Sequence, residues 1–81
     1  MYYYVYFLRS IRFPKTVYVG ITTNIKERLA THNSGGSIHT KNDRPWKLTI
    51  CVAFEQRDRA KQFERYLKTQ SGRAFAKKRL L

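Results

Sequence analysis

Two short segments near the N-terminus, separated by a turn, limit the fold of this chain more than any other feature. Residues 2–8 (YYYVYFL) and 16–22 (TVYVGIT) consist almost entirely of aromatic and β-branched residues, which favour β-strands. Between them, residues 12–15 (RFPK) supply the proline and the charge that are typical of a turn. We therefore expect the two segments to form an antiparallel hairpin.

Alternation along the second strand assigns its side chains to two faces of the sheet. Val17, Val19 and Ile21 form a purely aliphatic set, which we expect to face the core. Tyr18 and Gly20 then lie on the other, more open face. Because glycine has no side chain, this face has free space next to a tyrosine.

The middle of the chain predicts a helix, a loop and a third strand. Asn24 and Glu27 have the spacing of a capping box, so we expect a helix to begin there, with His32 extending its apolar stripe. Residues 33–43 are polar and rich in Gly and Ser, which predicts a loop. Residues 47–55 (KLTICVAFE) alternate between apolar and smaller or polar side chains, as a strand with one buried face does.

The C-terminal third predicts two further helices. Asp58 is expected to cap the first of them, which ends before the Ser-Gly pair at 71–72, and a short last helix is expected to begin at Arg73. A chain of 81 residues is too short for two cores. The predicted fold is therefore a single α/β (α+β) domain over residues 1–81, with a three-stranded antiparallel sheet flanked by helices.

The charge of the chain narrows its partners. Seventeen Lys and Arg residues against five Asp and Glu give a formal charge of +12, which favours a polyanion such as nucleic acid. A basic protein with no such role, or one that associates with ribosomes, is about as consistent with charge alone. No apolar run approaches the roughly 20 residues that cross a bilayer, so we expect no membrane contact.

Cysteine usage points to a reducing compartment, and we expect a cytoplasmic protein. The single Cys51 excludes an intramolecular disulfide, and with two histidines it cannot complete a structural zinc site of four ligands. Cys51 lies in the middle of the third predicted strand. There, a small buried packing residue is more common than a nucleophile.

Two tripeptides on the predicted hairpin carry a resemblance to a known family. Tyr4-Val5-Tyr6 and Tyr18-Val19-Gly20 resemble the two name-giving motifs of the GIY-YIG nuclease superfamily, with Tyr in place of the first Gly. The resemblance continues in order along the chain with Arg28, His32 and Glu64. Residues 72–76 (GRAFA) resemble the tail of the small stand-alone bacterial members of that superfamily.

This resemblance implies an endonuclease that hydrolyses phosphodiester bonds in DNA, selects its substrate by structure, and acts in repair or recombination. Glu64 would hold Mg²⁺ or Mn²⁺, because a hard cation prefers carboxylate oxygen. Arg28 would bind the scissile phosphate through its planar guanidinium. The general base stays open among Tyr6, Tyr18 and His32.

Other interpretations of the same residues also stay open. Glu64 has the spacing for an exposed ion pair with Lys68, and tyrosines in strands commonly serve as packing residues. The residues that we expect to contact nucleic acid are Gly20, His39, Lys41, Arg44 and Lys68. Since one small domain leaves no room for a recognition domain, selectivity would come from DNA shape or from a partner protein. A non-catalytic nucleic-acid-binding module of the same fold, and an RNA-binding factor, are the alternatives.

Overall fold

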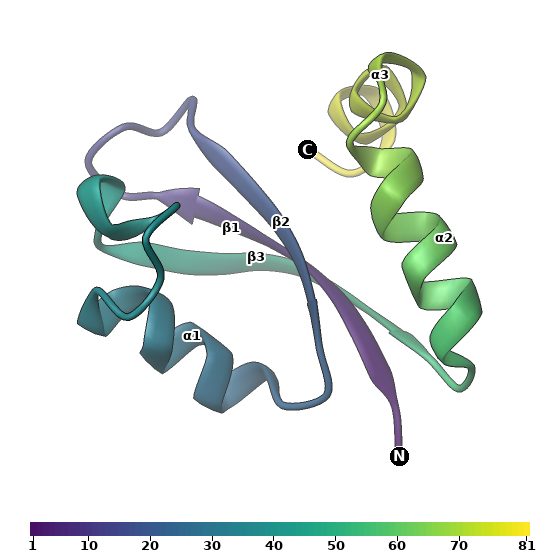
Figure 1. The fold of residues 1–81 in the computed structure, drawn as a ribbon. Helices are drawn as coiled ribbons and strands as arrows, with labels where there is room; N and C mark the ends of the chain where they lie inside the picture. The colour runs from purple at the N-terminus through teal and green to yellow at the C-terminus, as the bar shows by residue number, and fades with distance from the viewer.

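The computed structural model describes all 81 residues and contains one antiparallel sheet, three α-helices and a short 3₁₀-helix (Figure 1). The three strands have the order β2-β1-β3, which places β1 in the centre. In chain order, the elements are β1 (Tyr3–Ser10), β2 (Val17–Thr22), α1 (Ile25–Ser34), η1 (Lys41–Asp43), β3 (Trp46–Phe54), α2 (Arg57–Leu67) and α3 (Gln70–Arg79). The predicted fold class is confirmed.

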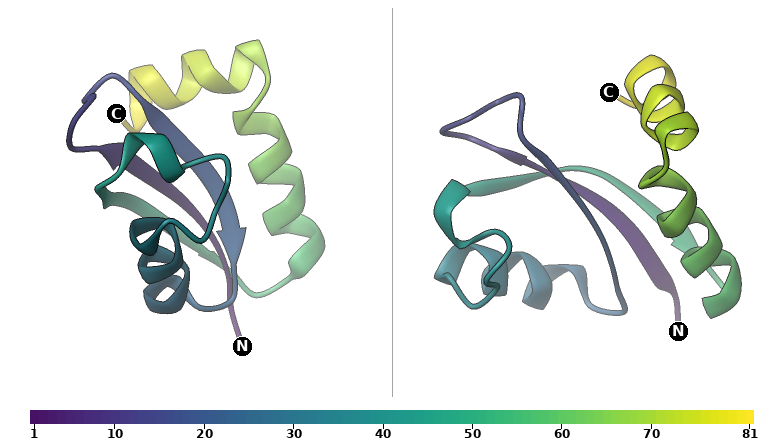
Figure 2. Two further views of the ribbon diagram at one scale, coloured as in Figure 1. Left: turned by 60° about the vertical axis from the view of Figure 1, so that its left-hand side comes forward. Right: turned by 45° about the horizontal axis from the view of Figure 1, so that its top comes forward.

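Strand β1 explains why the chain opens on an almost continuous aromatic run. It pairs antiparallel with β2 on one side and with β3 on the other, so Tyr6 lies opposite both Gly20 and Cys51. Helix α1 covers one face of the sheet, and α2 with α3 covers the other (Figures 1 and 2). A strand with neighbours on both edges and helices on both faces buries every side chain in its middle.

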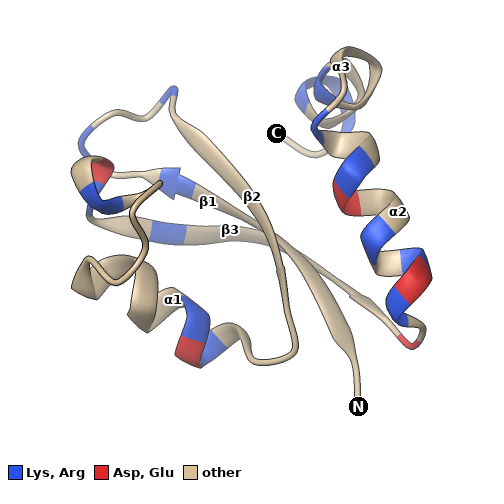
Figure 3. Ribbon diagram, viewed as in Figure 1, with Lys and Arg blue, Asp and Glu red and all other residues tan.

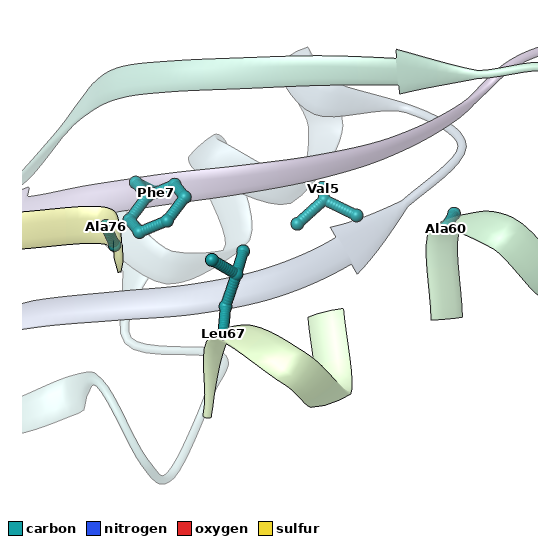
Figure 4. Packing of buried hydrophobic residues seen from close by; sticks show 5 residues of the cluster. All are labelled: Val5, Phe7, Ala60, Leu67 and Ala76. Atoms are coloured by element: carbon teal, nitrogen blue, oxygen red, sulfur yellow. The ribbon is translucent and has the colours of Figure 1, made fainter. Parts of the chain in front are cut away.

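The face under α2 and α3 holds the larger core cluster. Figure 4 shows its five buried members, namely Val5, Phe7, Ala60, Leu67 and Ala76. The aliphatic set of β2 packs against this cluster. The expectation that Val17, Val19 and Ile21 face the core is therefore confirmed.

The opposite face is less open than the sequence suggests. Tyr6, Leu8 and Trp46 are buried there, and α1 lays Ile25 and Leu29 over them. Gly20 is also buried. This face is closed because α1 follows β2 directly and covers the side of the sheet on which Tyr6 lies.

Two predicted helix starts in the C-terminal third are wrong. Helix α2 begins at Arg57 with Gln56 in the N-cap position, so Asp58 lies in the first turn, where a carboxylate favours the helix dipole, and caps nothing. Helix α3 begins at Gln70, three residues before Arg73, because the hydroxyl of Thr69 accepts a hydrogen bond from the Gly72 amide at 3.0 Å.

The prediction that Cys51 is a buried packing residue is also wrong. Cys51 is exposed because β3 is an edge strand, and the smaller core cluster reaches β3 only at Trp46. The part of the Cys51 side chain that the fold shields from water nevertheless raises the pKa of the thiol, so no activated thiolate forms there. None of the helices is both long and apolar enough to cross a membrane.

Candidate active site

The hydroxyl of Tyr6 on β1 is hydrogen-bonded to two residues of α1. It lies 2.9 Å from Nε2 of His32, and Nε of Arg28 donates a hydrogen bond to it at 3.4 Å. Arg28 and His32 are four residues apart and therefore lie on the same face of α1. The start of α1 sets their position, because the Glu27 amide donates to Oδ1 of the N-cap residue Asn24 at 3.1 Å.

The other ring nitrogen of His32 is also held by a buried hydrogen bond. Its Nδ1 lies 2.8 Å from the hydroxyl of Thr40, and Nε1 of Trp46 donates to the Thr40 carbonyl at 2.9 Å. His32 and Thr40 are both fully buried, with exposed fractions of 0%. Thr40 thus orients the imidazole ring. No sequence pattern singles out Thr40, because it lies in a polar loop without periodicity.

The tautomer of His32 sets the direction of two hydrogen bonds in this network. Arg28 can only donate, so the Tyr6 oxygen is the acceptor of that bond. With the ring proton on Nδ1, the Tyr6 hydroxyl donates to Nε2 of His32 and Nδ1 donates to Thr40, whereas the other tautomer reverses both bonds. In the Nδ1-protonated tautomer, His32 is positioned to receive the phenolic proton.

Burial keeps both members of the Tyr6–His32 pair neutral. It raises the pKa of Tyr6 above its usual 10.0, an effect that the hydrogen bond from Arg28 opposes without cancelling. Burial, together with the positive charge of Arg28, lowers the pKa of His32 below its usual 6.5. Near pH 7 the pair consists of a phenol and an uncharged imidazole.

Tyr18 and Gly20 of β2 form the rest of this site. The Tyr18 ring centroid lies 4.9 Å from that of His32 and 6.3 Å from that of Tyr6. The bond to Tyr6, together with the nearby Tyr18 hydroxyl, raises the pKa of Arg28, which stays charged. A Cβ at Gly20 would collide with the hydroxyl of Tyr6, so only glycine leaves room for that group.

Glu64 approaches from α2, the helix on the other face of the sheet. Its side chain is 17% exposed, and its carboxylate forms an ion pair with Nζ of Lys68 at 2.7 Å. The i, i+4 ion pair for which the sequence has the spacing is therefore present. Its negative charge contributes, after burial, to the raised pKa of Tyr6, which places the carboxylate within electrostatic range of the phenol.

Glu64 is not part of a protein cluster that could hold a metal ion by itself. The structure contains no group of three or more His, Cys, Asp or Glu residues that could hold a metal ion. Mg²⁺ fits a single carboxylate when substrate phosphates and water complete its shell. The donor at Glu64 therefore suits a hard cation that binds together with a phosphodiester, and a cage made only of protein ligands is absent.

The remaining predicted contacts lie in the segment between α1 and β3. His39 is exposed in the loop after α1. Lys41 and Arg44 line a polar hollow of about 350 Å³ beside η1, together with Arg12. The structure thus brings together the two tyrosines, Arg28 and His32, whereas none of the three loop residues makes a hydrogen bond to any of them.

Comparisons with known proteins give one consistent result. The family model described as the GIY-YIG catalytic domain matches residues 2–79. The structure-specific endonuclease subunit SLX1 of Candida dubliniensis is 42% identical over 73 residues, which cover 82% of this chain and 26% of that protein. The UPF0213 protein YsiG of Lactococcus lactis is 42% identical over 67 residues, which cover 82% of this chain and 62% of that protein.

A solved structure agrees in fold. The solution NMR structure of the UPF0213 protein BH0048 from Bacillus halodurans superposes with a TM-score of 0.57 at 31% identity, covering 95% of this chain and 81% of that one. The chain spans about a quarter of the fungal relative and less than two thirds of the Lactococcus lactis protein.

Proposed function

The chain belongs to the GIY-YIG catalytic domain family, and from this premise we propose that it is a metal-dependent endonuclease that hydrolyses phosphodiester bonds in DNA. The observation that carries the proposal is the buried hydrogen-bonded cluster of Tyr6, Arg28 and His32. It joins a proton acceptor, a polarisable hydroxyl and a permanent cation at one point.

Tyr6 serves as the general base in this proposal. It takes a proton from the attacking water while its own proton passes to Nε2 of His32, so no free phenolate has to form in a site that disfavours it. His32 is fully buried and therefore acts through Tyr6 rather than on the substrate. Since Tyr6 is only 2% exposed, the water approaches between the half-buried side chains of Tyr18 and Arg28.

Arg28 and Glu64 act on the phosphate. Arg28 uses only Nε on Tyr6, which leaves the two Nη groups for the non-bridging oxygens as their negative charge grows. Glu64 would hold Mg²⁺ or Mn²⁺, a cation that offsets charge on the phosphate and on the leaving oxygen when it is bound. For this, Lys68 has to release the carboxylate that it now pairs.

We also propose that residues 1–81 form one GIY-YIG domain that selects DNA by structure, such as branches or flaps, in repair or recombination in the cytoplasm. The family match over residues 2–79 supports the single domain. The names of the fungal relatives describe a subunit of a structure-specific endonuclease. This supports selection by DNA structure and a partner protein that contributes specificity.

A specific observation favours one other candidate function, a non-catalytic module that binds nucleic acid. The carboxylate of Glu64 already has a partner at 2.7 Å, and it belongs to no group of three or more potential metal ligands. If the ion pair persists in the complex with DNA, the cation has no place to bind and the domain binds without cleaving.

The test is a cleavage assay on flap, single-stranded and duplex DNA with Mg²⁺ or Mn²⁺. Glu64→Gln removes the charge and keeps the size of the side chain, and we expect it to lower the cleavage rate by about 100-fold or more while DNA binding persists. Glu55→Gln removes the same charge at an exposed position beyond β3 and is the matched control.

Each outcome separates the candidate functions. Metal-dependent products that disappear in Glu64→Gln and persist in Glu55→Gln support the enzyme. Binding without products on any DNA, at any tested metal, supports the binding module instead. Tighter binding of RNA than of DNA at the same salt concentration would favour an RNA-binding factor.

A further inference from the structure

A groove lies next to the candidate active site, on the other face of the sheet, between β2 and the two C-terminal helices. Its volume is about 420 Å³, within the range of sites that bind small organic groups. Phe7, Leu67 and Ala76 form its floor, and Figure 4 shows these three side chains converging between the sheet and the helices. Val17 and Val19 of the edge strand β2 complete an apolar wall.

The rim of the groove has a different chemistry from its floor. Three cations line it: Lys15 from the hairpin, Lys68 after α2 and Arg73 from α3. None of the ten residues that line the groove is acidic. Figure 3 shows that basic residues recur along α2 and α3, which flank the groove. An apolar floor beneath a basic rim complements a flat apolar group that carries negative charge at its edge.

The groove shares two residues with the candidate active site or its immediate partners. Tyr18 belongs to both, because it lines the groove and lies against His32. Lys68 also belongs to both, because it lines the groove and pairs with Glu64. A ligand in the groove therefore sits one helical turn from the carboxylate that would hold the metal ion.

We propose that this groove holds the base of an unpaired DNA nucleotide next to the scissile phosphate, with Lys15, Lys68 and Arg73 on the flanking phosphates. The base of a nucleotide is flat and largely apolar, and its phosphates carry the complementary charge. A base within a duplex is stacked and paired, so only an unpaired one reaches the floor. This inference rests on the proposed function and gives a reason why a flap or branch would be preferred.

The experiment measures binding, in EDTA, so that cleavage plays no part. Fluorescence anisotropy compares flap DNAs in which one nucleotide near the junction, at each position in turn, has lost its base. We expect one position at which the abasic substitution weakens binding about tenfold, since a single base contact contributes about that much. Positions two or more nucleotides away change little.

Matched variants connect this effect to the groove. Val17→Trp fills the groove and should abolish the difference between normal and abasic DNA, whereas Ala53→Trp places the same ring at an exposed position of β3 and should preserve it. Arg73→Ala should weaken flap binding more than Arg79→Ala, which removes the same charge from α3 outside the groove.

Failure of this inference is distinguishable from failure of the proposed function. If no abasic position alters affinity, or if Arg79→Ala costs as much as Arg73→Ala, the groove binds no base, even where cleavage is normal. If Val17→Trp does not fold, the abasic scan of the unmodified protein and the arginine pair still decide the matter. A position-specific abasic effect without any cleavage would support the groove and count against the enzyme.

Discussion

Tyr6 shows how one side chain takes on a chemical property from its surroundings. A phenol on an exposed strand would titrate near its usual pKa, but here burial raises that pKa while Arg28 opposes the rise. Burial and the charge of Arg28 lower the pKa of the neighbouring His32, so its imidazole stays uncharged and can accept a proton. Both shifts keep the proton on Tyr6 in the resting site, so in the proposed mechanism its transfer to His32 takes place together with proton abstraction from the attacking water.

The lowered pKa of His32 predicts how stability varies with pH. The unfolded chain binds a proton near pH 6.5 and the folded chain binds it only at lower pH, so the free energy of unfolding should fall as pH drops through 6.5 toward the lowered pKa. Above 6.5 this contribution is fully present. Chemical denaturation between pH 5 and 8 measures it, and His32→Gln should flatten this part of the profile.

His39→Gln is the matched control, because His39 is exposed and makes no hydrogen bond to His32 or to the residues around it. That variant should keep the pH profile of the unmodified protein. A profile that flattens equally in both variants would mean that His32 is not the group that titrates.

Single residues were predictable where a family motif or a clear alternation marked them. Tyr6, Tyr18, Arg28 and His32 lie together as the resemblance implies. Thr40 could not be predicted, because its importance depends on a loop that folds back onto α1.

At the scale of elements, the start of α3 depends on an N-cap at Thr69 that the sequence pattern does not indicate. Ser71 and Gly72 look like a helix end, yet Gly72 lies inside α3, where a Cβ would collide with the carbonyl of Tyr66. Glycine here allows α3 to turn closely against the end of α2, as Figure 2 shows. Local pattern marks a glycine as a breaker, whereas close backbone approach is visible only in three dimensions.

Thr69→Ala should therefore destabilise the protein. Its hydroxyl accepts from the Gly72 amide at 3.0 Å, and loss of such a cap costs about 1 kcal/mol of unfolding free energy. Thermal or denaturant unfolding measures the change. Thr69→Ser should recover most of it, and Thr23→Ala, at an exposed threonine before α1, should change little. An unchanged stability in Thr69→Ala would show that the cap does not hold α3.

At the scale of the whole molecule, the two faces of the sheet carry different parts of the candidate site. The α1 face carries the tyrosines, Arg28 and His32, while the α2 and α3 face carries Glu64 and the basic groove. The two faces meet at the edge strand β2, whose Tyr18 takes part in both. The hairpin and the fold class followed from alternation and turn residues. The meeting of the two faces at one edge depends on helix placement, which alternation does not encode.

The central claim is that Tyr6 drives hydrolysis of DNA, and its most direct test is the single-turnover rate of Mg²⁺-dependent flap cleavage by Tyr6→Phe. Phenylalanine keeps the ring and loses only the hydroxyl that joins β1 to α1. We predict a rate about 100- to 10,000-fold lower, with DNA affinity within about twofold, because general-base catalysis contributes on that order. Tyr3→Phe, on the opposite face of β1, should cleave at the normal rate. Cleavage by Tyr6→Phe at the rate of the unmodified protein, or an equal loss in both variants, would contradict the claim.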